Sequence, residues 1–497
     1  MPQVQKGPTL PRPASPAGGE QSRRDFLRGL VSTTERARLE RLQVAYATVP
    51  PFGYWSDVKL RLVRRATMGL AAVDVNEVRR IGYQSWLNEQ VQYDEIDDSA
   101  TEALIASRYP LLLQSPAQIT AANTGTVQSQ LQEAWIYRAA FSKRQLYERM
   151  VEFWSDHFNI AISKVGNLKA IDDRDVIRKY AMGTFGDLLK ASAHSPAMLA
   201  YLDQNTSRAG APNQNYAREL MELHTLGVNG GYTQDDVAEM SRVLTGWTYG
   251  SAGDFLFNSG RHDFGAKTVL GVTIPASSSS AGASAVQEGE KMLDVLINHP
   301  STARFIATKM LKWLLTPEPT AQQVSAIASV YRVTKGDIKY MVRAILNDAW
   351  VAAAPAKFKR PFHFVASSLR ATNPNVTALT TMNSQVRTLG QQLFFYETPD
   401  GYPDSVEYWS GNMPPRWSFT NTLAGATTGQ TVVDTAPYMT GSTAAAVDKI
   451  QADFFADELP ASTRTALLNY LNGGTFTATR VRETIALALS SAEFQWY

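Results

Sequence analysis

Chemically active side chains are densest between Asn213 and His224, in a segment that follows Pro212 and is predicted to be a helix. Four polar residues of this segment occupy adjacent positions on one helical face: Asn215, Arg218, Glu219 and Glu222. A carboxylate can act as a general acid or base, and arginine and asparagine can hold an anion or a hydroxyl group. A solvated surface helix explains the same pattern, because Arg218 and Glu222 are spaced as an i,i+4 ion pair. Both interpretations stay open on these residues alone.

A second polar group occupies positions 152–159, which read Glu-Phe-Trp-Ser-Asp-His-Phe-Asn. Glu152 and Asp156 are four residues apart and therefore share an acidic stripe on a predicted helix. His157 falls instead on the apolar side, next to two aromatic residues. It is either a core histidine bonded to nearby backbone, or an acid, base or ligand that faces a polar pocket.

A third group lies in the loop of a predicted hairpin, at Arg261–Lys267. Its candidates are His262 as a proton carrier, Asp263 as a binding residue and Lys267 as an anion holder. Polar residues in a loop are easily solvated, which explains them without any function, whereas a loop that projects into a cleft would make them a site.

Composition limits the chemistry further. The 497 residues include no cysteine and six histidines, which excludes a disulfide scaffold, a cysteine nucleophile and any thiolate-bound metal. Glu222 and His224 lie about 200° apart on a helix and cannot share one ion, so we assign no metal ligands and leave the cofactor open. The net charge is +2. We expect no nucleic-acid partner, because the chain beyond position 49 is slightly acidic. We also expect no transmembrane segment, because the long uncharged stretches are polar.

The N-terminal tail carries the positive charge, with eight basic and four acidic side chains among residues 1–49. It is rich in proline, glycine and serine at its start, and we expect it to be disordered. Ser22–Arg28 reads S-R-R-D-F-L-R, which resembles a twin-arginine export signal. The apolar stretch after it is short. The protein is therefore either exported to the periplasm or the exterior, or it is cytoplasmic with a vestigial signal.

The elements that must position these groups are mostly helices. We expect a mainly α, large multi-helix domain with a small β-hairpin insertion near residues 254–274, where Asp254–Phe257 would pair with Thr268–Ile274. A long helix is predicted from about Val127 to Ile162. After the tail, we divide the chain into an N-terminal helical part at 50–250, the hairpin and a flexible loop at 251–290, and a C-terminal helical part at 291–497. Residues 50–497 are expected to share one continuous core.

The strongest motif runs from Asn213 to Trp247, as N-x-N-Y-A-R-E-L-x-E-L-H-T-L-G-V, then G-Y-T-Q-x-D-V, then L-T-G-W. Further matches follow in order along the chain, at Arg64–Gly69, Phe153–Phe158, Ser195–Leu199, His262–Gly271 and Ser491–Gln495. Together these motifs resemble the bacterial family catalogued as domain of unknown function 1800. The resemblance extends over about residues 56–497.

The resemblance implies a large, mostly helical exported protein, often encoded beside an exported sulfatase-like protein. It also implies that the motif residues converge on one cleft: Asn215, Arg218, Glu219, Glu222, His157, His262, Asp263 and Lys267. The chain departs from the family at Ser155 and Asp156, where the family often has His-Asn. It departs again at Gln214, which replaces Glu, and at Tyr402, where the family tends to have Trp. The departures at Ser155, Asp156 and Gln214 alter potential ligand or acid positions, which argues against a metal centre built on the family's F-W-H-N-H-F box, the motif that Phe153–Phe158 resembles.

Three functions remain open on this sequence. The first is a hydrolase or transferase that acts on an envelope polymer or glycan, with Glu219, Glu222, His157 and His262 as catalytic candidates. Its binding candidates are Asn213, Asn215, Arg218, Asp263 and Lys267. The second is a non-catalytic binding or assembly protein that works with an exported, sulfatase-like partner. The third is a metal-binding protein.

Overall fold

The computed structural model of the protein describes residues 53–497. Helices make up 65% of it, and the strands within these residues are short antiparallel pairs. The expectation of a mainly α fold with small hairpins is therefore confirmed. The predicted tail at residues 1–49, with its export-like motif at Ser22–Arg28, lies outside the described residues.

The helices of the first half begin at Val58, and several of them start at a residue whose side chain caps the first turn. Their bounds are α3 Val58–Ala66, α4 Ala72–Ile81, α5 Tyr83–Val91, α6 Ser99–Arg108, α7 Pro116–Ala121, α8 Thr124–Phe141, α9 Gln145–His157, α10 Ile162–Val165, α11 Leu168–Asp172, α12 Phe185–His194, α13 Pro196–Tyr201, α14 Gln214–Glu219 and α15 Gln234–Val243. Two π-helices continue this series, η3 at Asp173–Arg178 and η5 at Leu220–Thr225.

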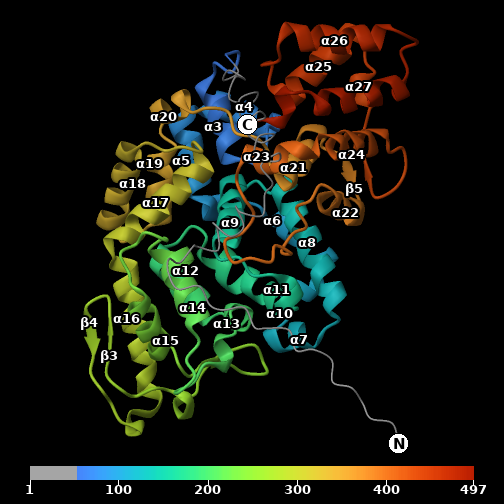
Figure 1. Ribbon diagram of the computed structural model, residues 1–497. Helices are drawn as coiled ribbons and strands as arrows, with labels where there is room; N and C mark the ends of the chain where they lie inside the picture. The colour runs from blue at the N-terminus through green and yellow to red at the C-terminus, as the bar shows by residue number, and fades with distance from the viewer. Residues whose placement is uncertain (1–52) are drawn as a thin grey trace, which may run out of the picture. The chain divides into compact units, whose positions relative to one another are not determined.

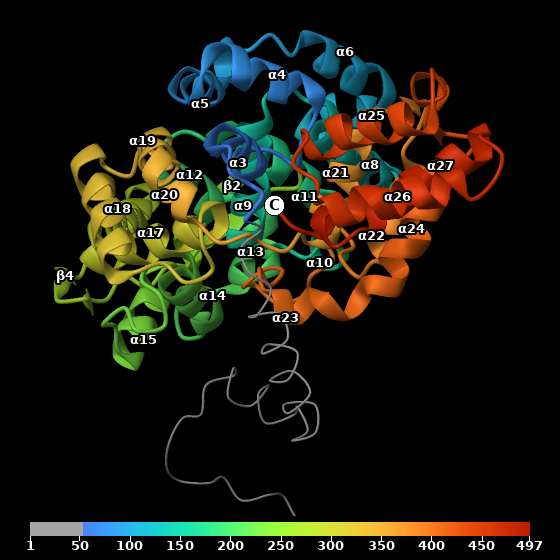
Figure 2. The same ribbon diagram turned by 90° about the horizontal axis from the view of Figure 1, so that it is seen from above.

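The second half is also helical. Its helices are α16 Val286–Asn298, α17 Pro300–Leu314, α18 Ala321–Thr334, α19 Ile338–Ile345, α20 Asp348–Ala353, α21 Pro361–Thr372, α22 Thr380–Thr388, α23 Val406–Trp409, α24 Met413–Gly425, α25 Thr443–Phe455, α26 Ala461–Asn472 and α27 Ala478–Ser490. Helices α25, α26 and α27 pack on one another, and α24 packs on α27 (Figure 1). Helices α17, α18 and α19 form another packed group, seen from above in Figure 2.

The expected long helix from Val127 to Ile162 is two helices, α8 and α9. Ser142 ends α8, and its hydroxyl donates to Asp98 at 2.6 Å. The next backbone nitrogen, of Lys143, donates to the same carboxylate at 3.2 Å instead of continuing the helix. The second helix then runs on a new axis and ends at His157.

The β structure near the middle of the chain is two hairpins, not one. Strand β1 (Trp247–Tyr249) pairs with β2 (Phe255–Phe257), and β3 (Lys267–Val269) pairs with β4 (Val272–Ile274). The predicted pairing of 254–257 with 268–274 is therefore wrong. Leu270 and Gly271 both have positive φ, as a tight two-residue turn requires, so β3 finds its partner locally. A third pair joins β5 (Asn375–Val376) to β6 (Thr431–Val432).

Buried apolar residues from Leu60 to Phe494 form one hydrophobic cluster. Charged side chains are buried within the same body, and most form ion pairs there, for example Arg178 with Glu148 and Lys169 with Asp172. No helix within residues 53–497 is long and apolar enough to cross a membrane.

Candidate functional site

Asn213, the first residue of the Asn213–His224 segment, has a structural role as the cap of α14. The side-chain oxygen of Asn213 accepts from the backbone nitrogens of Asn215 and Tyr216, which caps α14. Its amide nitrogen donates to the carbonyl oxygen of Leu202 at 2.7 Å. Asn213 therefore starts the helix and ties it to the preceding turn, while Asn215 is exposed.

The polar side chains of this segment form hydrogen bonds with different partners. Arg218 donates to Gln234 at 2.9 Å, and Glu222 accepts from the Tyr232 hydroxyl at 3.0 Å. The expected Arg218–Glu222 ion pair is not formed. The helix changes to the wider π form at Leu220, which removes the i,i+4 alignment on which that pair depends. Glu219 is partly buried beside these groups.

His157 lies in the hydrophobic core and not on a polar surface. It is 1% exposed, and aromatic rings surround it, including those of Trp154, Phe158 and Phe305. Its Nε2 lies 3.1 Å from the carbonyl oxygen of His224, a second buried histidine. Burial, reinforced by the charge of Lys309, lowers the pKa of His157 well below its usual value and that of His224 to about 3. Both rings are therefore neutral at physiological pH.

The third predicted group, Arg261–Lys267, forms ion pairs that hold the β3–β4 hairpin in place. Lys267, with a fully buried side chain, donates to Glu288 at 2.7 Å. His262 Nε2 lies 3.3 Å from the same carboxylate without hydrogen-bond geometry, and its Nδ1 lies 2.8 Å from the carbonyl oxygen of Thr245. Asp263 accepts two hydrogen bonds from Arg242 of α15. These contacts join the hairpin to α15 and α16.

The structure thus places the predicted residues in three separate environments and does not bring them into one cleft. Their contacts are made within the α14–α15 surface, the aromatic core around His157, and the base of the β3–β4 hairpin. None of them lines either of the two pockets described below. Among them, Asn213 is a helix cap, His157 packs in the core, and Asp263 and Lys267 form ion pairs.

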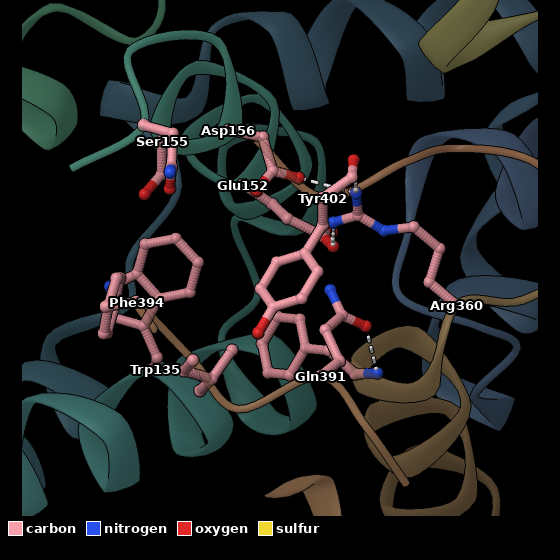
Figure 3. Close-up of a pocket in the computed structure, with 11 residues that line it drawn as sticks. Trp135, Glu152, Ser155, Asp156, Arg360, Gln391, Phe394 and Tyr402 are labelled. Carbon is pink, nitrogen blue, oxygen red and sulfur yellow. Dashed lines mark hydrogen bonds and ion pairs between the residues drawn. The ribbon is translucent and has the colours of Figure 1, made fainter. Parts of the chain in front are cut away.

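A polar pocket lies elsewhere, where α8, α9, the start of α21 and the segment after α22 meet (Figure 3). Its cavity volume is small, about 20 Å³ for the centre of a water-sized molecule, and the pocket is partly open to solvent. Helix α9 supplies acidic and hydroxyl side chains, and the facing elements supply an arginine, an amide and aromatic rings. Its main lining residues are Trp135, Glu152, Ser155, Asp156, Asn159, Arg360, Phe362, Gln391, Phe394 and Tyr402.

Arg360 is the electrostatic centre of this pocket. Its guanidinium donates to Glu152 and, at 2.6 Å, to Asp156, one turn further along α9. Burial opposes its charge, but Asp156 and Glu152 outweigh burial and raise the pKa of Arg360. Burial raises the pKa of Asp156, against the lowering effect of Arg360. The Asp156 side chain is 21% exposed, so its carboxylate is the acidic group of this pair that reaches solvent.

Two polar groups of the pocket have no partner among the described residues. The Ser155 hydroxyl forms no hydrogen bond there, and the Gln391 amide uses only its oxygen, which accepts from Phe362. Figure 3 shows the Gln391 amide nitrogen directed toward the space between Arg360 and Tyr402. A hydrogen-bond donor and a hydroxyl that can donate or accept, in a pocket that aromatic rings also line, can hold a ligand that carries hydroxyl groups.

The backbone approaches this pocket closely at Gly401. Its φ is +75°, and a Cβ there would lie 2.2 Å from the carbonyl oxygen of Asp156. Only glycine allows the 401–402 segment to pass so near the end of α9. Tyr402 then lines the pocket, and its hydroxyl donates to the backbone carbonyl oxygen of Gln392 at 2.7 Å.

Sequence reasoning missed Arg360, Gln391 and Gly401 as site residues. The acidic stripe of Glu152 and Asp156 was the available signal, because carboxylates on a helical face that becomes buried need a cationic partner. Nothing local showed which arginine supplies it. Within residues 53–497, no three carboxylate or imidazole side chains lie where they could share a metal ion.

A family model described as "Protein of unknown function (DUF1800)" matches residues 61–496, and the chain belongs to that family. No curated protein and no solved structure matches the chain.

Proposed function

We propose that the pocket around Arg360 binds a hydroxyl-rich ligand, of the class to which the sugar units of envelope glycans belong. The observation that carries the proposal is two unused polar groups, the Ser155 hydroxyl and the Gln391 amide nitrogen, in a pocket that the rings of Trp135 and Phe394 also line. Sugars present hydroxyls that both donate and accept, and apolar ring faces that pack on aromatic side chains. The Asp156 carboxylate supplies a further acceptor at the mouth of the pocket.

The proposed location is the cell envelope, to which the twin-arginine-like Ser22–Arg28 would direct a folded protein. In this proposal the protein works there with an exported partner such as a sulfatase-like protein. Cell fractionation tests the location. We expect the wild type in the envelope fraction and a double Arg23→Lys, Arg24→Lys variant in the cytoplasm. A wild-type protein retained in the cytoplasm would contradict export.

The binding test uses the full chain against an array of envelope oligosaccharides, followed by calorimetry on the best ligand. The variant Ser155→Ala removes one unused hydroxyl, so its Kd should rise about 5- to 10-fold, the equivalent of one hydrogen bond. Ser163→Ala is the matched control, because Ser163 is exposed on α10 and lines neither pocket. An unchanged Kd in Ser155→Ala, or an array without any binding, would overturn the proposal.

A second candidate function is a hydrolase or transferase at the same pocket. It is favoured by the raised pKa of Asp156, because a carboxyl shifted by burial beside a pocket is suited to general acid or base work. Turnover of the bound glycan should be lost in Asp156→Asn, with ligand affinity reduced far less. Glu222→Gln is the control, since its amide oxygen can still accept from Tyr232. A glycan that binds but is never cleaved or transferred would contradict the catalytic function and leave glycan binding as the function of the pocket.

The metal-binding alternative receives no support from the ligand geometry of residues 53–497.

A further inference from the structure

A second pocket lies on the other side of the chain segment that carries Arg360. Residues 357–359 run antiparallel to 495–497, with backbone hydrogen bonds between Lys357 and Tyr497 and from Lys359 to Gln495. Neighbouring side chains of an extended segment point in opposite directions. Arg360 therefore reaches the first pocket, and Lys359 reaches one lined by Trp55, Phe454, Phe455, Phe494 and Trp496.

Lys359 differs from the other buried lysines of residues 53–497. Those others each pair with a carboxylate: Lys169 with Asp172 at 2.9 Å, Lys267 with Glu288 at 2.7 Å and Lys357 with Asp404 at 2.6 Å. Lys359 is 5% exposed, and its Nζ lies 3.8 Å from the centre of the Phe494 ring. Its Nζ donates no hydrogen bond to any group that the structure describes.

The charges that face Lys359 disfavour its ammonium form. Arg64 of α3 and Arg416 of α24 both repel a positive charge there, after burial itself, and together they lower the pKa of Lys359 well below its usual value. Glu458 pairs with Arg64 at 2.6 Å, and Glu493 accepts from the Thr463 hydroxyl at 2.9 Å; neither carboxylate forms an ion pair with Lys359. A desolvated amine beside other cations is the usual arrangement of a nucleophilic lysine.

We propose that Lys359 is a nucleophilic amine and that its aromatic pocket takes a small aldehyde or ketone as a Schiff base. The nitrogen lone pair forms a bond to the carbonyl carbon, and a proton passes from nitrogen to oxygen to give a carbinolamine. The C–O bond then breaks, the oxygen leaves as water with one added proton, and a protonated C=N bond remains. Glu493 lines the same pocket and can exchange that proton.

The test treats the full-length protein with propanal and sodium cyanoborohydride at pH 7, and measures alkylation at each lysine by peptide mass spectrometry. Lys312, an exposed lysine, is the internal reference. A normal lysine is almost wholly protonated at pH 7. We therefore expect Lys359 to be alkylated at least 10-fold faster than Lys312. A rate at Lys359 equal to or below that at Lys312 would overturn the proposal.

The variant Lys359→Met provides the second readout. A neutral amine has no ion pair to lose, so this variant should keep its melting temperature and lose only the fast-reacting fraction. Lys312→Met should keep that fraction. A fast fraction that persists in folded Lys359→Met assigns the reaction to another residue and overturns the proposal. Should Lys359→Met fail to fold, the site-resolved rates in the wild type decide.

Discussion

Arg360 is the residue on which the charge balance of the first pocket depends, because it faces both Glu152 and Asp156. Replacing it by methionine leaves Asp156 without its cation and leaves the buried Glu152 with Arg149 alone, at 3.2 Å. Removing one partner of a buried ion pair costs about 3–5 kcal/mol. We expect Arg360→Met to lower the free energy of unfolding by about that amount in urea denaturation.

The matched control is Arg464→Met. Arg464 pairs with Asp448 at 2.5 Å, and the Asp448 side chain is 59% exposed, so this ion pair contributes about 0–1 kcal/mol. Equal losses in the two variants would show that Arg360 is not the electrostatic centre of the pocket.

Three buried histidines give the protein a predictable response to acid. Burial lowers the pKa of His157, His224 and His363, so they stay neutral in the folded state. The unfolded chain binds protons at these residues as pH falls through about 6.5, so stability is lost on acidification. Each contributes up to about 1.4 kcal/mol per pH unit. The free energy of unfolding should therefore fall from pH 7 to pH 5.

The variant His224→Leu removes one of these three histidines, and with it the proton that His224 takes up when the chain unfolds. The free energy of unfolding should change less steeply with pH in this variant than in the wild type. The difference in slope corresponds to the uptake of up to about one proton on unfolding, because all other titrating groups are common to both proteins. Urea denaturation at pH 5, 6 and 7 measures the two slopes. Parallel pH profiles would contradict the assignment of His224 as a buried neutral histidine.

At the scale of elements, the close approach of the 401–402 segment to α9 shapes the pocket. Gly401→Ala adds a methyl group where 2.2 Å separates it from the Asp156 carbonyl oxygen, so Tyr402 must move. Gly271 has a similar φ of +73° with nothing within 4 Å of its Cβ position. Gly271→Ala therefore measures the backbone strain alone, about 1 kcal/mol.

We expect Gly401→Ala to lose about 1–3 kcal/mol more than Gly271→Ala in urea denaturation, the usual cost of overpacking. It should also weaken binding of the pocket ligand, which Gly271→Ala should not affect. Similar stability and affinity in both variants would mean that the approach of Gly401 does not shape the pocket.

At the scale of the whole molecule, the parts that local sequence determines could be predicted. The helical fold follows from apolar periodicity and caps, such as Thr233 with Asp236 at the start of α15. The break at Ser142 and the local turn at Leu270–Gly271 could not, because each depends on a partner or a backbone angle that periodicity does not report.

The candidate site was harder to predict for the same reason. The motif residues are dense in sequence, yet Asn213 is a cap, His157 is core and Lys267 is half of an ion pair. The pocket instead joins Asp156 to Arg360, which are 204 residues apart. Single-sequence spacing carries no information on such a pair, because only the packing of α9 against the start of α21 brings it together.

The central claim is that a hydroxyl-rich ligand occupies the Arg360 pocket, and a crystal structure of the protein soaked with its best glycan tests it most directly. We predict density for a sugar ring against Trp135 or Phe394, with hydroxyl oxygens about 3 Å from the Ser155 hydroxyl and the Gln391 amide nitrogen. Density for the glycan at another surface, with this pocket free of it, would contradict the account.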